Sequence, residues 1–198
     1  MKILIFLTFL IIAISTYSQR INLNDSVIKC GSVAGLKIGD NIDNVKLLNS
    51  DFIFQPDSVC NYGIEGEEEG LLVIKNLDTL LFMWKKESSP DLIAGFCILS
   101  DRFVTSKNTK IGSTVADFIK KDKDFYLSKD YFYDLNESYY PPDLNKSIGD
   151  IIITTAFEFF APQAGTIGKY KTDEIEEKTK KFNDKEIKLR RIHIFKWN

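Results

Sequence analysis

The sequence predicts an α+β fold made of two tandem units, each a short helix followed by antiparallel strands. Three observations support this prediction: a Lys-Ile-Gly segment that occurs twice, alternating apolar runs after each copy, and a composition with 44% hydrophobic and 13% aromatic residues. We expect the units to span residues 19–105 and 106–198 as one globular domain. Both helices should pack on one face of a curved antiparallel sheet.

The first eighteen residues have the pattern of an export signal. Lys2 gives a short positive region, residues 3–14 are an almost unbroken apolar run, and Ser18 is a small residue before Gln19. A helix of that length covers about 18 Å, whereas a hydrocarbon core is roughly 30 Å thick. The Ser-Gln junction resembles those of Gram-negative signal peptides. We therefore expect a signal peptide over 1–18, cleaved between Ser18 and Gln19, and a periplasmic or secreted protein.

Each predicted unit begins with the same local pattern. Residues 37–45 return in similar form as residues 110–118. Gly39 and Gly112 allow a sharp turn, and the residues that follow can cap a helix by accepting hydrogen bonds from free backbone N–H groups. Apolar residues at helical spacing then predict a short helix in each copy. The caps are either Asp40 and Ser113 or, one position later, Asn41 and Thr114.

Alternating apolar residues after each helix predict strands joined by turns. In the last of them Ile192 and Ile194 alternate with His193, which places the histidine on the opposite face. The pair Arg190-Arg191 indicates a β-bulge in that strand, and the charged stretch 172–182 an exposed helix or excursion. The predicted strands are 71–75, 80–84 and 92–100 in the first unit and 131–135, 151–160 and 187–197 in the second.

This plan resembles a family of exported tandem-repeat domains that includes the beta-lactamase inhibitor protein and the SmpA/OmlA-type outer-membrane assembly lipoproteins. The resemblance covers residues 37–48 and 110–121 and the order of elements. It implies the fold and a capacity to bind other proteins. It transfers no functional residue, because the acylated cysteine of the lipoprotein members has no counterpart in this chain.

Three cysteines remain after the leader, so at least one thiol stays unpaired in an oxidising compartment. Cys30 and Cys60 flank the first predicted helix and are the candidates for a disulfide. Cys97 lies in a strand-like apolar run, where a cysteine acts as a small buried residue. Three scattered cysteines and the single His193 lack the spacing of zinc ligands, so we expect no metal and no cofactor.

The small net charge of −2 argues against nucleic-acid binding, which needs a strongly basic face. The C-terminal segment is nevertheless locally basic. It could contact anionic lipid headgroups or an acidic partner, or it could be an ordinary solvated surface. Its basic residues are Lys178, Lys180, Lys181, Lys185, Lys188, Arg190, Arg191 and Lys196.

A second candidate surface is aromatic. Tyr139 and Tyr140 precede two prolines, and tyrosines held in a loop can anchor a peptide or a sugar at small entropic cost. The alternative is that these rings fill the core. We take Tyr139 and Tyr140, together with Arg190 and Arg191, as the candidate binding residues.

The favoured function is a non-catalytic interaction domain of the bacterial cell envelope that binds another envelope protein. One alternative is a cell-wall or carbohydrate hydrolase, which would need a carboxylate pair such as Glu158 and Asp150 in a cleft. Another is a periplasmic protein that binds a small ligand in an apolar pocket between helices and sheet. His193 is expected to face solvent beside Arg190 and Arg191 rather than to act in catalysis.

Overall fold

The structure is a computed structural model of residues 1–198. The predicted leader over 1–18 and the predicted strand 131–135 lie outside the residues it describes. The described residues are 19–64, 69–86, 88–129, 136–148, 151–160, 167–170 and 178–197.

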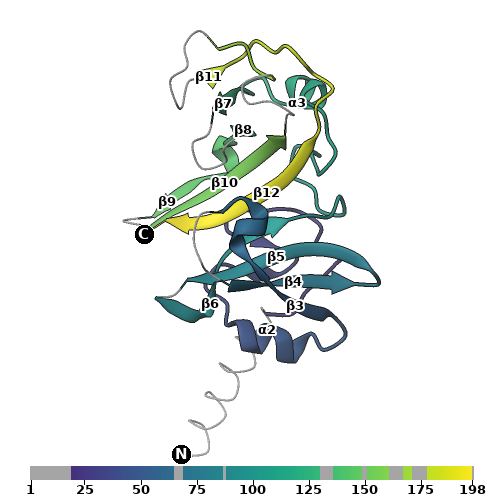
Figure 1. The fold of residues 1–198 in the computed structure, drawn as a ribbon, viewed down its shortest axis with the longest axis vertical. Helices are drawn as coiled ribbons and strands as arrows, with labels where there is room; N and C mark the ends of the chain where they lie inside the picture. The colour runs from purple at the N-terminus through teal and green to yellow at the C-terminus, as the bar shows by residue number, and fades with distance from the viewer. Residues whose placement is uncertain are drawn as a thin grey trace, which may run out of the picture.

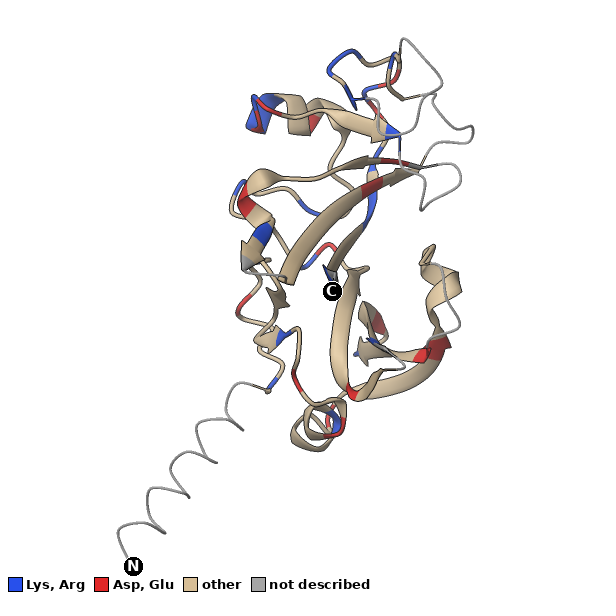
Figure 2. Ribbon diagram, turned by 90° about the vertical axis from the view of Figure 1, so that its left-hand side faces the viewer, with Lys and Arg blue, Asp and Glu red and all other residues tan. Residues whose placement is uncertain are grey.

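One antiparallel sheet dominates the part of the chain that the structure describes (Figure 1). It has ten strands in the order β11-β7-β8-β10-β12-β6-β5-β4-β3, with β9 pairing β10. The turned view in Figure 2 shows that the strands bend strongly. The strands are β3 (Ile53–Ser58), β4 (Glu69–Lys75), β5 (Asp78–Lys86), β6 (Ser89–Ile98), β7 (Leu127–Lys129), β8 (Asn136–Tyr139), β9 (Lys146–Ile148), β10 (Ile151–Phe160), β11 (Lys178–Thr179) and β12 (Leu189–Trp197).

This sheet shows that the predicted fold of two helix-then-sheet tandem units is wrong. Strand β6 from the first half of the chain pairs with β12 from the second, and residues 95–98 lie opposite 192–195. A strand edge left open in either half would expose unpaired N–H and C=O groups. Pairing β6 with β12 satisfies both edges at once and makes one sheet of the whole domain.

Two short α-helices lie among the described residues, α2 (Ile42–Leu48) before β3 and α3 (Val115–Lys121) before β7, at opposite ends of the molecule in Figure 1. The N-caps are Asn41 and Thr114, whose side chains accept hydrogen bonds from the backbone N–H groups three residues later. No described helix has the length and hydropathy needed to cross a membrane.

The residues before the two helices have like conformations. Gly39 and Gly112 both have positive φ, +92° and +85°, which favours glycine. Asp40 and Ser113 each accept a hydrogen bond from the backbone N–H three residues earlier. Each segment also pairs with the sheet, the first with β6 and the second with β12.

The main core lies on the face of the sheet that the helices cover. Alternate residues of the longer strands point into it, and α2 and α3 add apolar side chains from both halves of the chain. An aromatic group sits beside α3, where the ring of Phe118 contacts four other rings. Those partners are Phe125, Tyr139, Phe157 and Phe159.

A smaller core covers part of the opposite face. The short helix η1 (Val59–Tyr62) follows β3 and packs on that face. The ring of Tyr62 stacks on that of Phe82, with the two ring centroids 4.1 Å apart. The Phe82 ring in turn stacks on that of Trp84, with a centroid distance of 6.2 Å. Both faces of the sheet are therefore covered where β5, β6 and β12 lie side by side. A second short helix, η2 (Pro142–Leu144), joins β8 to β9.

Candidate functional site

A groove of about 510 Å³ lies beside the C-terminal end of β12, near the point marked C in Figure 1. One wall comes from the beginnings of β6 and β10 and the end of β12, and the other from residues 30–39. Within these residues the short strands β1 (Ser32–Val33) and β2 (Leu36–Lys37) form a hairpin. The apolar lining is Ile38, Leu92, Ile93, Ala94, Ile151 and Ile153.

Backbone contacts hold the two walls of the groove together. The Gly39 N–H donates to the Ile93 carbonyl at 2.8 Å, and the Ile93 N–H donates to the Asp40 carbonyl at 2.9 Å. A Cβ placed on Gly31 would lie 3.1 Å from the Cδ1 atom of Ile153. The backbone of the hairpin therefore approaches the sheet closely at this point, because Gly31 has no side chain.

Among the described residues, the two charged residues that line the groove are both basic. Lys37 is exposed on β2, and Lys196 is half-buried near the end of β12. Asp40 lies nearby, but it is buried and accepts a hydrogen bond from the Lys37 backbone N–H at 2.8 Å. Burial raises the pKa of Asp40, which the hydrogen bond and the charge of Lys37 offset only in part. Burial also raises the pKa of Cys30, against a smaller lowering by Lys146.

A second candidate site is buried on the other face of the sheet. The His193 Nε2 atom on β12 lies 2.8 Å from the Glu158 Oε2 atom on β10, and both side chains are fully buried. A guanidinium nitrogen of Arg191 lies 3.8 Å from the same oxygen. Across the sheet, Cys97 on β6 is the register partner of His193 and is also fully buried.

Helix η1 covers this cluster from one side. The Arg191 side chain donates to the carbonyl of Asn61 at 3.3 Å and lies 5.8 Å from the ring centre of Tyr62. The Tyr62 hydroxyl donates to Asp57 at 2.6 Å. Arg191 thus connects η1 to the buried carboxylate of Glu158.

The environment of His193 favours its charged form. Burial alone would lower its pKa, but interactions with Cys97 and Glu158 outweigh burial and raise the pKa to about 9. At neutral pH the His193 imidazole is therefore protonated against Glu158, so removing the Glu158 side chain would leave this buried positive charge without its hydrogen-bonded partner.

We expect stability to fall at mildly alkaline pH because of His193. Its folded-state pKa of about 9 exceeds the 6.5 of an ordinary histidine, so its stabilising contribution is complete below pH 6.5 and is lost as the pH rises through 9. Urea unfolding at a series of pH values measures this loss.

A His193→Gln variant is the control, because it should show a flatter profile over the same range. The other ionisable groups around the imidazole, Cys97, Glu158, Arg191 and Tyr62, remain in this variant. A free energy of unfolding in the unsubstituted protein that stays constant or increases between pH 6.5 and 9 would contradict the prediction.

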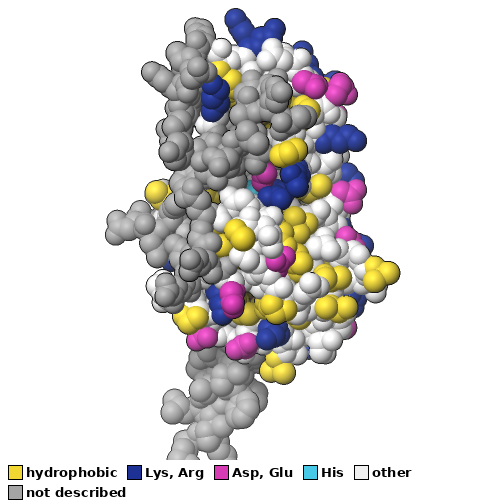
Figure 3. Space-filling view, viewed as in Figure 1, with side chains coloured by type: hydrophobic (Ala, Val, Ile, Leu, Met, Phe, Trp, Pro, Cys, Tyr) yellow, Lys and Arg dark blue, Asp and Glu magenta, His cyan; other side chains and the backbone are white. Residues whose placement is uncertain are grey.

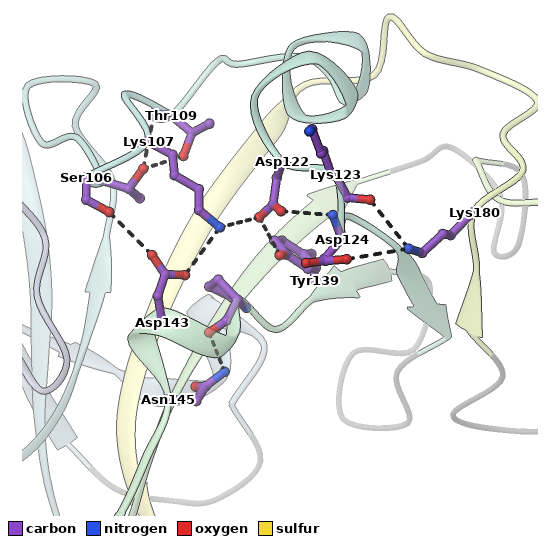
Figure 4. A network of polar contacts seen from close by, with 12 residues as sticks. Ser106, Lys107, Thr109, Asp122, Lys123, Asp124, Tyr139, Asp143, Asn145 and Lys180 are labelled. Carbon is purple, nitrogen blue, oxygen red and sulfur yellow. Dashed lines mark hydrogen bonds and ion pairs between the residues drawn. The ribbon is translucent and has the colours of Figure 1, made fainter.

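A third polar cluster links α3 to β8 and η2 (Figure 4). Asp122 accepts hydrogen bonds from Lys107 at 2.7 Å and from the Tyr139 hydroxyl at 2.6 Å. Lys107 also lies 3.6 Å from Asp143. Burial would raise the pKa of Asp122, but these two hydrogen bonds outweigh it and lower the pKa. These polar groups pair with one another, so we interpret the cluster as a structural link between the loop at 105–109 and the core.

The prediction that Tyr139 belongs to an exposed aromatic binding surface is wrong. Tyr139 is only 1% exposed and packs against Phe118, Phe125 and Phe157. It is the last residue of β8 and points into the main core, because successive strand residues point to opposite faces. Tyr140 follows it outside the strand and is half-buried.

The two predicted arginines lie at a β-bulge in β12. The register of β10 and β12 shifts between Glu158 and Phe159, which leaves Arg190 without an opposite residue, as the sequence predicted. Arg190 is exposed, and its guanidinium lies 4.6 Å from the ring centre of Phe160. Arg191 instead turns toward Glu158. His193 does not face solvent as predicted, because the face it shares with Arg191 is covered.

The remaining predictions have mixed outcomes. Cys30, Cys60 and Cys97 are all free, so the predicted Cys30–Cys60 disulfide does not form. Asp150, the proposed partner of Glu158 in a hydrolase, lies outside the described residues. Among the described residues, no cluster of His, Cys, Asp and Glu could hold a metal ion.

Some basic side chains of the C-terminal segment contact other parts of the protein. The amine of Lys180 lies 4.0 Å from Asp124, and that of Lys178 lies 4.8 Å from the ring centre of Tyr126. On the face shown in Figure 3, basic side chains are spread among acidic ones rather than gathered in one patch.

Sequence reasoning missed the groove and the Glu158–His193 pair. Strand alternation placed His193 on the face opposite Ile192 and Ile194, and it could have placed Glu158 there too, since Glu158 is also flanked by apolar residues. No sequence signal shows that residues 59–62 return across that face.

Comparisons with known proteins add one structural likeness. No family model matches the chain, and no curated protein matches it. The chain is similar to the crystal structure of the uncharacterized protein YfeY from Escherichia coli, at 10% sequence identity and a TM-score of 0.41. The match covers 89% of this chain and 97% of that chain.

Proposed function

We propose that this protein is an exported, non-catalytic binding protein of the cell envelope that holds a small ligand with an apolar body in the groove. Export rests on the apolar sequence after Lys2, which has the pattern of a signal peptide. Binding rests on the groove itself.

The groove is the observation that carries the proposal. Ligand sites in proteins are concave, mostly apolar, and roughly 300–1,000 Å³ in volume. A volume of about 510 Å³ with an isoleucine-rich lining has these properties. The groove lies between the sheet and the segment before α2. The pocket of the predicted ligand-binding alternative would instead lie between the helices and the sheet.

The position of the reactive side chains supports a role without catalysis. Glu158, His193 and Cys97 are fully buried, and they lie on the face of the sheet opposite Ile93 and Ile153 of the groove. A ligand in the groove would meet isoleucine, serine and lysine side chains instead. These side chains suit retention of an apolar molecule more than its chemical conversion.

Calorimetric titration with two ten-carbon probes tests the proposal. Decanoate and decyltrimethylammonium share an alkyl chain and differ in the charge of the head group. At least one of them, used below its micelle concentration, is expected to bind with a stoichiometry near one. Leu92→Asn should weaken this binding by about tenfold, because it replaces part of a buried leucine contact with an amide.

Leu77→Asn is the matched control. Leu77 is 97% exposed in the turn between β4 and β5 and does not line the groove. The same substitution there should leave binding unchanged. Absence of binding by both probes, or equal binding by the Leu92→Asn variant and the unsubstituted protein, would rule out the groove as the ligand site.

A further inference from the structure

We infer that the ligand of the groove is a single-chain amphipathic anion whose head group lies against Lys196 and Lys37. This inference rests on the proposed binding function and adds the chemical class of the ligand. It is carried by the charges that line the groove and by the absence of acidic side chains opposite them in the described lining.

The amines of Lys37 and Lys196 have no acidic partner within the described residues. Neither amine forms a hydrogen bond or an ion pair with protein there. Six lysines elsewhere on the surface, by contrast, each lie near an aspartate. These pairs are Lys29–Asp25, Lys46–Asp43, Lys75–Asp51, Lys107–Asp122, Lys110–Asp101 and Lys180–Asp124.

The charged side chains in the described lining of the groove have one sign. The described lining residues include Lys37 and Lys196 and no aspartate or glutamate. The charge of Lys146 on β9 also reaches Cys30 at the groove wall. Asp40, the acid close to Lys37, is buried and does not line the groove. An anionic head group would thus meet uncompensated cations, whereas a cationic one would be repelled.

The shape of the groove selects the rest of the ligand. Ile38, Ile93 and Ile153 give it an apolar surface, and the hydroxyls of Ser32, Ser88 and Ser89 can donate hydrogen bonds to an anion. The groove is enclosed on two sides by the hairpin and the sheet. A volume of about 510 Å³ suits one free alkyl chain more than the surface of a bilayer.

Comparison of the two probes tests the inference. Decanoate should bind at least about tenfold more tightly than decyltrimethylammonium, and raising the salt concentration should reduce the difference. Lys196→Gln should weaken decanoate binding by about fivefold, and the double variant Lys37→Gln/Lys196→Gln by at least about tenfold. Glutamine keeps most of the aliphatic stem and removes the charge.

Lys185→Gln is the matched control, because Lys185 is exposed and outside the groove. It should bind both probes as the unsubstituted protein does. If circular dichroism shows that the change at Lys196 prevents folding, Lys37→Gln alone is used for the binding test, because Lys37 is exposed.

The outcomes separate this inference from the proposed function. Equal binding of both probes that Leu92→Asn still weakens would leave the binding function intact and overturn the anionic class. Decanoate binding that the double lysine variant does not change would overturn it too. If decanoate associates with the protein only in anionic phospholipid vesicles, the free monomer is not the ligand. Failure of both probes to bind would overturn the function and the inference together.

Discussion

Replacing Glu158 with alanine is expected to lower the free energy of unfolding by about 3–5 kcal/mol, because the substitution leaves a buried charge without its partner. The Glu158 carboxylate lies 2.8 Å from His193 and 3.8 Å from Arg191. After the substitution the positive charges of His193 and Arg191 face a cavity inside the protein. Urea unfolding followed by tryptophan fluorescence measures the effect, since Trp84 lies in the apolar cluster on the same face.

A double variant separates the value of the ion pair from the cost of breaking it. Glu158→Met/His193→Leu removes the charges of this pair and puts apolar side chains of similar size in their place. Replacement of a buried ion pair by packed apolar residues is often neutral or stabilising. We therefore expect the double variant to be more stable than Glu158→Ala at neutral pH. A loss below about 1 kcal/mol in Glu158→Ala would show that solvent reaches the pair.

Much of the local structure could be predicted from the sequence because it depends on neighbouring residues. Helix caps, turn glycines and apolar alternation act over a few positions, and α2, α3, β10 and β12 lie where these signals place them. Strand β3 was missed for a local reason. Its Pro56 resembles a turn residue, but a proline is tolerated on the edge strand of a sheet, where its missing N–H is not needed.

The arrangement of the strands could not be predicted in the same way. Residues 95–98 and 192–195 are almost a hundred positions apart, and nothing local in either strand selects the other as its partner. The two similar helix entries, at Gly39 and Gly112, led to the expectation of two tandem helix-then-sheet units within one domain. The sheet instead joins both halves, because pairing β6 with β12 leaves neither strand with an open edge.

The candidate sites were hidden for related reasons. The groove brings together residues near positions 30–39, 88–94, 151–153 and 196, and no motif connects these segments. Tyr139 was misplaced because a tyrosine beside prolines resembles an exposed loop residue, whereas its position in β8 directs it into the core. His193 was misplaced because strand alternation indicates a face but not whether that face is covered.

Phe118→Ala is expected to destabilise the protein by about 3–5 kcal/mol, the range for removing a large aromatic side chain from a core. Phe118 is 1% exposed, and its ring packs against those of Phe125 and Phe159, each with its centroid 5.2 Å away. These partners come from the segment after α3 and from β10, so the cavity would loosen the contact between the helix and the sheet. Urea unfolding of the variant and the unsubstituted protein measures the difference.

Two substitutions show whether the effect comes from lost packing. Phe118→Leu keeps much of the volume and should cost less than about 1.5 kcal/mol, as volume-conserving apolar changes usually do. Phe160→Ala removes the same ring from a position that is 43% exposed. It should cost no more than about 1 kcal/mol, since it leaves no internal cavity. If Phe118→Ala and Phe160→Ala were equally stable, the ring of Phe118 could not hold α3 against the sheet.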